Sequence, residues 1–237
     1  MENLAPNGKK SNLTPEQYKL VRTPAFKKWF GDWENSPETA SKVVDENREP
    51  LVVYHGVKSG EKFNVFSQTT DIGFHFAIDK NIAKGMSKNE KLQQRATEEG
   101  YWYEEVLYEC FLNIRTVEFI ADLELWKISD FEKHLNELAI DNNFNWGYNR
   151  KIGRIENTRN LYSKIEGAKS NFDGLWYINE YEGRFTKWKK KCYIVFDPTQ
   201  IKLADGTNTT FDGNNPDIRY AKGGTINNSF EYTIGGL

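Results

Sequence analysis

The spacing of apolar residues changes from helical to strand-like near residue 43. Before that point, three Ser/Thr-Pro pairs are typical of helix starts, because the hydroxyl caps the first turn and proline fits there at no cost: Thr14-Pro15, Thr23-Pro24 and Ser36-Pro37. Four aromatic residues recur at helical spacing and are expected to face a core: Phe26, Trp29, Phe30 and Trp33. We therefore predict a helical lead-in over residues 14–42, and disorder over the polar residues 1–13.

Beyond residue 43, short apolar runs alternate with polar turns, which predicts strands. A hairpin is predicted over residues 41–56, and a strand leading into a helix over 71–87, with Asp79 as candidate N-cap. The remaining predicted elements are strands within 101–120, 172–185 and 189–205, helices over 88–100 and 122–141, a polar excursion over 142–170 and a flexible tail over 223–237. Because strands and helices do not alternate as in βαβ units, we predict an α+β fold with mainly antiparallel pairing.

The composition is that of an ordinary soluble protein rich in aromatic residues. Hydrophobic residues make up 38% and charged residues 28% of the chain, and the net charge is -2, so no general attraction to nucleic acid or anionic membrane is expected. The 7 Trp, 12 Tyr and 15 Phe favour a β-rich core or a pocket built from rings. No run is long enough to span a membrane and no signal peptide begins the chain, which predicts a cytoplasmic protein. Cys110 and Cys192 lie in apolar runs and are predicted to be reduced, and no Cys or His spacing indicates a metal site.

Two of the three histidines stand in strand-like, aromatic surroundings. His55 directly precedes Gly56, and His75 follows Gly73 between two phenylalanines. A lone histidine at a strand end is usually satisfied by the backbone, but the glycine beside it also lets a ligand approach closely. His134 falls in a charged helical pattern and is predicted to lie at the surface.

A pair of carboxylates follows the strand predicted near residue 178. Glu180 and Glu182 are two residues apart, so in a strand their side chains point to the same face. A cluster of lysines lies close by in the sequence: Lys187, Lys189, Lys190 and Lys191. Such charges are typical of a solvated hairpin end, and a catalytic or phosphate-binding role is the alternative interpretation.

Taken in order, four stretches of the chain resemble the ADP-ribosyltransferase superfamily and, more narrowly, the ADP-ribosyltransferase domains of phage polyvalent proteins and related mobile-element proteins. They are "VRTPAFKKWFGDWENSPETASKVVDENREPLVVYHG", "GFHFAIDKNIA", "FDGLWYINEYEG" and "YIVFDPTQIKLADGTNTTFDGNNPDIRYAKGG". The resemblance implies one domain over residues 14–222. It also implies a split β-barrel of two antiparallel sheets, which follows the helical lead-in and binds NAD+ in a cleft without a Rossmann motif.

The resemblance assigns roles to individual residues. In this superfamily His55 would hydrogen-bond the ribose on the nicotinamide side, and the backbone of Gly56 would hold the carboxamide. His75 takes the place of the tyrosine that stacks on nicotinamide in the G-I-Y-F-A segment, and would form the nicotinamide wall with Phe76. The other residues expected to bind NAD+ are Tyr54, Phe63, Phe66, Gly73, Phe74 and Asn179. No metal is implied.

The residue directly before Tyr193 departs from the pattern of the poly-ADP-ribosylating enzymes. They carry a glutamate directly before Y-I-V-Y-D, where this chain has Cys192. A neutral thiol does not stabilise the positive charge that develops as nicotinamide leaves. The stretch Asn179-Glu180-Tyr181-Glu182 matches the N-x-x-E pattern of phage-type relatives, so Glu182 is the predicted catalytic carboxylate and Glu180 the next candidate.

The expected function is cleavage of NAD+, the co-substrate, and transfer of ADP-ribose to a macromolecular acceptor, either a protein or a nucleic acid. If the chain is phage encoded, the host cytoplasm is the expected location. Two alternatives stay open. The substitutions at His75 and Cys192 suggest a domain that binds NAD+, ADP-ribose or a protein without turnover. An NAD+ glycohydrolase toxin differs in using water as the acceptor.

Overall fold

The computed structural model describes residues 2–57, 62–67, 72–87, 94, 97–100, 106–120, 122, 172–179 and 190–219. Their helices are α1 (Pro15–Leu20), α2 (Pro24–Phe30), α3 (Lys80–Ser87) and a 3-10 helix, Pro198–Gln200. The strands are β1 (Val53–Val57), β2 (Phe74–Ala77), β3 (Val106–Leu112), β4 (Val117–Phe119), β5 (Gly174–Asn179), β6 (Lys190–Val195) and β7 (Ile201–Leu203). Outside the described residues lie the predicted helix over 122–141 except for its first residue, the predicted elements over 142–170 and 223–237, and Glu180 and Glu182.

Strong caps begin the two short N-terminal helices. The Thr14 hydroxyl accepts from the backbone N–H of Gln17 at 3.2 Å, and the Gln17 side chain accepts in return from the backbone N–H of Thr14 at 3.1 Å. Thr23 caps α2 through the N–H of Phe26 at 3.3 Å. Beyond α2 the chain continues in turns and bends to residue 42, so the third helix start predicted at Ser36-Pro37 and the helical character predicted as far as residue 42 were wrong. The predicted aromatic residues do face a core, in a cluster that also includes Phe111 and Phe211: Phe26, Trp29, Phe30 and Trp33.

Residues 2–13, whose polar composition suggested disorder, have a defined conformation in the structure. Leu4 and Lys10 form an isolated β-bridge. Ser11 Oγ donates to the Glu49 carboxylate at 2.5 Å, and Arg22 donates to the same carboxylate at 2.9 Å. Glu49 is 0% exposed, so it needs these donors. Hydrogen bonds between polar side chains therefore order this segment, which composition alone does not indicate.

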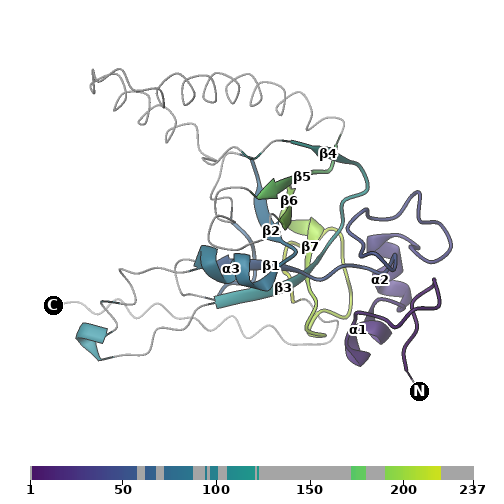
Figure 1. The fold of residues 1–237 in the computed structure, drawn as a ribbon, viewed down its shortest axis with the longest axis horizontal. Coiled ribbons are helices and arrows are strands. Elements are labelled where there is room, and N and C mark those ends of the chain that lie inside the picture. Colours follow the sequence, from purple (N-terminus) through teal and green to yellow (C-terminus); the bar gives the residue numbers. More distant parts are fainter. Residues whose placement is uncertain are drawn as a thin grey trace.

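The seven strands form one mixed sheet in the order β4-β5-β6-β2-β1-β3-β7 (Figure 1). β4 and β5 are parallel, and all other neighbours are antiparallel. The hairpin predicted over 41–56 is reduced to an isolated bridge, Val44↔Pro50, ahead of β1. Asp79 precedes α3, and its carboxylate accepts from the backbone N–H of Asn81 at 2.8 Å, as expected for the predicted N-cap. A mainly antiparallel sheet with few helices agrees with the predicted α+β class, and the split barrel of two sheets stays a prediction.

A narrow seam separates β1 from β2 within this sheet. In the part of the chain that the structure describes, the two strands meet at Tyr54↔Ala77. By contrast, β1 pairs with β3 along its whole length, and β2 does so with β6. The seam divides the sheet into one half made of β4, β5, β6 and β2 and another made of β1, β3 and β7. Beside this pair, the backbone carbonyl of His75 is contacted by a side chain, that of His55.

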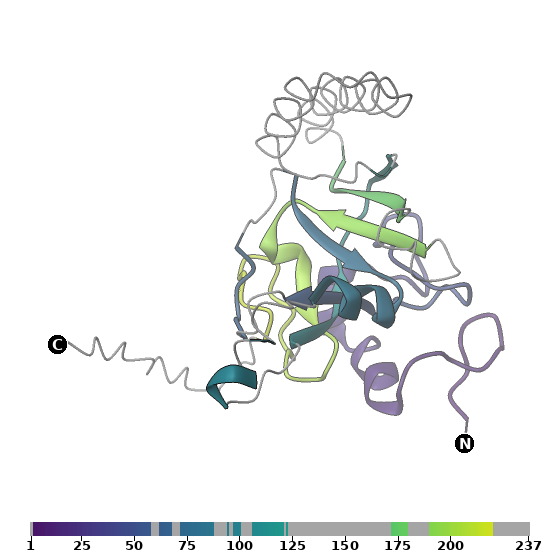
Figure 2. The same ribbon diagram turned by 60° about the vertical axis from the view of Figure 1, so that its left-hand side comes forward.

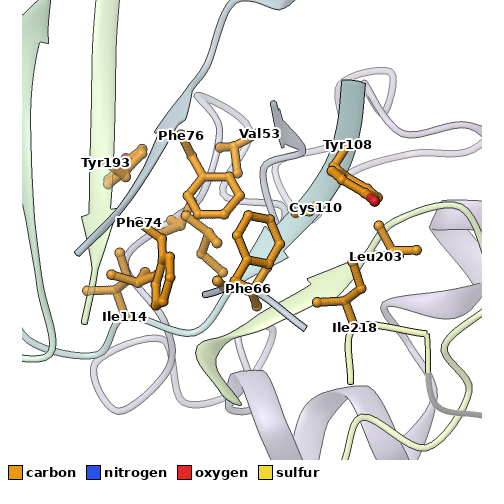
Figure 3. Close-up of a cluster of buried hydrophobic side chains, with 14 of the residues drawn as sticks. Val53, Phe66, Phe74, Phe76, Tyr108, Cys110, Ile114, Tyr193, Leu203 and Ile218 are labelled. Atoms are coloured by element: carbon orange, nitrogen blue, oxygen red, sulfur yellow. The ribbon is translucent and has the colours of Figure 1, made fainter. Parts of the chain in front are cut away.

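Alternation along β2 sends its side chains to opposite faces of the sheet. Phe74 and Phe76 belong to a core cluster with residues of β1, β3, β6 and β7, part of which Figure 3 shows. Ala77 belongs to a second cluster with Ile82 and Ala83 of α3, the helix that lies across β1 on that face (Figures 1 and 2). None of the described helices has the length and apolar character needed to cross a membrane.

Candidate active site

His55 bridges the seam between β1 and β2. Its Nδ1 lies 2.7 Å from the backbone carbonyl oxygen of His75. Because a carbonyl oxygen only accepts hydrogen bonds, Nδ1 carries the proton and donates it. Burial lowers the pKa of His55, and the bond to the His75 carbonyl opposes this shift. The ring is therefore neutral at pH 7 and above, and Nε2 is a hydrogen-bond acceptor.

Aromatic rings enclose His55 on its own face of the sheet. The ring centroids of Phe66 and Phe76 lie 4.9 and 5.3 Å from that of His55. Tyr108 anchors the loop that carries Phe66. Its hydroxyl donates to the carbonyl oxygen of Phe63 at 2.7 Å and accepts from the N–H of Phe63 at 2.6 Å. Figure 3 shows Phe66 between Phe76 and Tyr108. The structure thus brings Phe66 to the side of His55, with Phe63 packed against Phe66 and Tyr108.

His75 points to the other face of the sheet, away from its neighbour Phe76. Its Nδ1 lies 3.3 Å from the hydroxyl of Tyr177 in β5, and the two rings meet edge to face with centroids 5.9 Å apart. Burial lowers the pKa of His75 to about 3, and the nearby His55 ring adds to the shift. His75 is therefore neutral at physiological pH. The two residues expected to share the nicotinamide wall, His75 and Phe76, lie on opposite faces.

Packing alone explains the two glycines of the predicted site. A Cβ at Gly56 would lie 2.0 Å from the carbonyl oxygen of Ala83 and 2.9 Å from Cβ of Ser87, both in α3. A Cβ at Gly73 would lie 2.3 Å from the carbonyl oxygen of Val195 in β6. Each glycine permits a close approach of backbone to backbone. Their presence is therefore not in itself a sign of a ligand.

Gly56→Ala is expected to destabilise the protein by about 1–3 kcal/mol, because α3 has to move away from β1 to make room. Gly85→Ala in the same helix is the matched control, since no atom lies within 4 Å of its added Cβ. Alanine favours a helix over glycine by roughly 0.5–1 kcal/mol, so this control should be at least as stable as the wild type. Urea unfolding measures both. An unchanged midpoint for Gly56→Ala would contradict the contact between α3 and β1.

Cys192, at the position where the poly-ADP-ribosylating enzymes carry a glutamate, lies in the middle of the sheet. It pairs with Ala77 of β2 on one side and with Tyr177 of β5 on the other, and it is 1% exposed. Both cysteines of the chain are free, as predicted. Asn179 ends β5 opposite Lys190 and is buried. The predicted carboxylates, Glu180 and Glu182, follow it in the sequence but lie outside the described residues.

Tyr54 lies on the α3 side of β1, between Ala77 and Glu109 in register. Lys80 Nζ lies 2.7 Å from a Glu109 carboxylate oxygen and 5.7 Å from the centre of the Tyr54 ring. Burial raises the pKa of Tyr54, and Glu109 adds to the shift. Since Lys80 already pairs with Glu109, this carboxylate is a poor substitute for the glutamate that Cys192 replaces. Over the described ranges, no group of three or more His, Cys, Asp or Glu side chains is placed to hold a metal ion.

Sequence reasoning missed two tyrosines that contact the histidine site. Tyr108 holds the loop over His55, and Tyr177 contacts the ring of His75. Each lies within an apolar strand and is typical of a core residue in the sequence. A buried tyrosine hydroxyl does need a partner, which is the one signal that the sequence carried. Only the pairing of the strands reveals which partner it has.

The mixed seven-stranded sheet with few helices is consistent with the fold of an ADP-ribosyltransferase domain. A family model described as ADP-Ribosyltransferase in polyvalent proteins matches residues 45–211. This match covers more than half of the chain, and the chain belongs to that family. The resemblance seen in the four sequence stretches is confirmed. A search of curated proteins and a search of solved structures each found no match.

Proposed function

We propose that this domain cleaves the bond between nicotinamide and ribose in NAD+ and transfers ADP-ribose to a macromolecular acceptor. Membership of the family supports an ADP-ribosyltransferase with NAD+ as its substrate. The observation that carries the proposal for this chain is the histidine arrangement at the seam, where His55 is neutral, oriented and enclosed by rings. Phage or mobile-element origin and action in the host cytoplasm are part of the same proposal.

NAD+ is proposed to bind along the seam between β1 and β2, which would separate the two sheets of a split barrel. The single point of pairing at Tyr54↔Ala77 supports this position, because a ligand there displaces few backbone hydrogen bonds. The backbone of Gly56, two residues beyond that pair, is the proposed partner of the carboxamide. The domain is proposed to extend over residues 14–222.

Nε2 of His55 is proposed to accept a hydrogen bond from a hydroxyl of the nicotinamide-side ribose. Since Nδ1 already donates to the His75 carbonyl, Nε2 is the nitrogen left to meet a ligand, and an acceptor nitrogen suits a hydroxyl donor. The packing of Phe66 and Phe76 against the ring fixes its orientation before binding. Less side-chain freedom is then lost when NAD+ binds.

His75 is proposed to contact the nicotinamide ring. A protonated histidine would repel the cationic nicotinamide of NAD+, but its lowered pKa of about 3 keeps His75 neutral. Phe76, on the opposite face, is proposed to support His55 instead of forming the same wall. Phe74 and Phe76 thus contribute through the core, whereas His75 contributes at the ligand.

Glu182 is proposed as the catalytic carboxylate, with Glu180 oriented towards the acceptor. As the C–N bond breaks, its electron pair leaves with nicotinamide and positive charge grows on the ribose. A carboxylate placed there stabilises this charge. An acceptor nucleophile then donates an electron pair to the ribose carbon and loses its proton. The N-x-x-E match beginning at Asn179 supports this assignment.

A domain that binds NAD+ without turnover is the second candidate, and the position of Cys192 favours it. The Cys192 thiol, which stands where the poly-ADP-ribosylating enzymes carry a glutamate, is buried among apolar side chains of β2, β5 and α3. A carboxylate at position 192 would be costly to desolvate, so the surroundings of Cys192 suit an apolar side chain and not a catalytic glutamate. A glycohydrolase differs from the proposed transferase only in its acceptor.

The wild-type protein is expected to release free nicotinamide when it is incubated with NAD+. A binder would retain NAD+ in equilibrium dialysis but release none. Adenine-labelled NAD+ in a host lysate then separates the two enzymes. A transferase leaves label on macromolecules, whereas a glycohydrolase leaves all of it as free ADP-ribose. Bound NAD+ without any nicotinamide would contradict the proposed reaction.

A further inference from the structure

We propose that Lys202 is a positioning residue for the NAD+ site, which acts through the peptide unit that joins Asp217 to Ile218. This unit holds the loop over residues 62–67, which packs beside His55. It lies beyond residue 211, where the match to the family model ends. The link to NAD+ rests on the proposed function, whereas the contacts themselves belong to the free protein.

The peptide unit between Asp217 and Ile218 is held on both sides. Its carbonyl oxygen, that of Asp217, accepts from Lys202 Nζ at 3.1 Å. Its N–H, that of Ile218, donates to the carbonyl oxygen of Asn64 at 2.9 Å. The unit is trans and planar, so its C=O and N–H point in opposite directions. A contact that fixes the carbonyl therefore also fixes the direction in which the N–H meets the loop.

Ile218 is tied to β7 as well as to the loop. Its own carbonyl oxygen accepts from the N–H of Leu203 at 3.0 Å and from Nδ2 of Asn208 at 3.0 Å. Its side chain is 0% exposed and belongs to the core cluster that contains Phe66. Figure 3 shows Ile218 beside Leu203. The loop is thus attached to β7 at this point, in addition to its attachment to Tyr108.

Lys202 is a buried cation. It lies in β7 and is 0% exposed, and its ammonium also donates to the carbonyl oxygen of Asn215. Burial lowers its pKa to about 8, while the charges of Asp212, Asp217 and Asp197 raise it. The side chain is therefore mostly protonated at pH 7, and burial of this charge works against the folded state. A buried charge of this kind is better explained by the two carbonyls that it orients than by a gain in stability.

The loop fixed in this way forms part of the wall around His55. Phe66 packs edge to face on His55, with ring centroids 4.9 Å apart, and its centroid lies 5.5 Å from that of Phe76. If the loop moves, these rings no longer hold His55 in one orientation before NAD+ binds. The ordering then has to take place on binding, which we expect to raise KM for NAD+ by about 3- to 10-fold.

Amide hydrogen exchange, followed by NMR, tests the positioning in the free protein. In the wild type we expect the Ile218 amide to exchange as slowly as the amides paired between β1 and β3. Lys202→Met keeps a side chain of similar length but removes the ammonium. It should speed exchange at Ile218 by about 10-fold or more, as for loss of a hydrogen bond from a charged group, and leave the amides paired between β5 and β6 unchanged.

Urea unfolding separates positioning from a general contribution to stability. Lys202→Met is expected to be at least as stable as the wild type, because an apolar side chain replaces a buried charge. A variant that does not fold would contradict the proposal, since Lys202 would then be a residue that the fold itself requires. Rapid exchange at Ile218 in the wild type, or an unchanged rate in Lys202→Met, would also overturn it.

Lys42→Met is the matched control. The Lys42 ammonium also donates to two backbone carbonyl oxygens, those of Pro37 at 2.8 Å and Glu38 at 2.6 Å. These carbonyls belong to the turns that follow α2. The same substitution at this position should leave exchange at Ile218 and the KM for NAD+ as in the wild type.

Nicotinamide release tests the effect on the ligand. Lys202→Met is expected to raise KM for NAD+ by about 3- to 10-fold and to leave kcat within about twofold of the wild type, because the reacting groups stay in place. An unchanged KM alongside faster exchange at Ile218 would refute the link to the NAD+ site. If the wild type releases no nicotinamide, the proposed function fails, and the exchange rates still decide whether Lys202 positions the peptide.

Discussion

Glu182→Gln is expected to slow nicotinamide release by about 100-fold or more while NAD+ affinity stays close to that of the wild type. The amide keeps the shape and hydrogen bonding of the side chain but removes the charge that stabilises the developing cation. Ground-state affinity is expected to come from the rings and from the ribose contact of His55, which this change leaves in place. Steady-state kinetics give kcat, and calorimetry gives Kd for NAD+.

Glu180→Gln is the matched control, two residues away with the same change in charge. It is expected to reduce labelling of the acceptor more than it reduces nicotinamide release. If the wild type and both variants bind NAD+ alike and none releases nicotinamide, the domain is a binder. A Glu182→Gln variant as fast as the wild type would place the catalytic carboxylate elsewhere, and Glu180 would be the next residue to test.

Local signals predicted two of the three expected N-terminal helix starts, while Ser36-Pro37 begins a turn. The Thr-Pro pairs at Thr14 and Thr23 begin α1 and α2 as expected, because a cap depends on residues within one turn. Asp79 contacts the start of α3 for the same reason. The order of the four motifs also identified the family, which the match over residues 45–211 confirms. These inferences needed no knowledge of which strands are neighbours.

Strand pairing accounts for what the sequence could not reveal. The pattern "GFHFA" groups His75 and Phe76 as neighbours, yet strand geometry sends them to opposite faces, one to Tyr177 and the other to His55. Gly56 suggested an approaching ligand, and the structure shows that α3 also packs against this residue. The element that crosses a glycine is fixed by tertiary structure, so no local pattern could identify it.

The seam depended on long-range structure as well. Its position follows from how far β1 and β2 remain paired, which one residue pair, Tyr54↔Ala77, defines. The same holds for the N-terminal segment, where Ser11 meets Glu49 across 38 positions of sequence. Composition predicted disorder there because it counts polar residues without knowing whether they have partners. In both places the decisive interaction is a hydrogen bond between distant parts of the chain.

The two roles of His55 can be separated by substitution. His55→Ala removes the donor to the His75 carbonyl as well as the acceptor proposed for ribose. We expect it to abolish measurable nicotinamide release. Loss of the hydrogen bond to the His75 carbonyl should also cost about 0.5–1.5 kcal/mol of stability, so a loss of activity in this variant alone does not identify a ligand contact.

His55→Asn makes the distinction. The asparagine amide places an N–H donor near the position of Nδ1 but has no counterpart of Nε2, so the bond across the seam is kept and the ribose acceptor is lost. We expect urea unfolding of His55→Asn to stay closer to the wild type than that of His55→Ala, while nicotinamide release is lost in both. If His55→Asn retains some activity, its KM for NAD+ should be higher than that of the wild type, because the hydrogen bond to the ribose is lost. If His55→Asn folds like the wild type and turns over NAD+ at a comparable rate, His55 serves only to join the two halves of the sheet, and the ribose must be recognised by another residue.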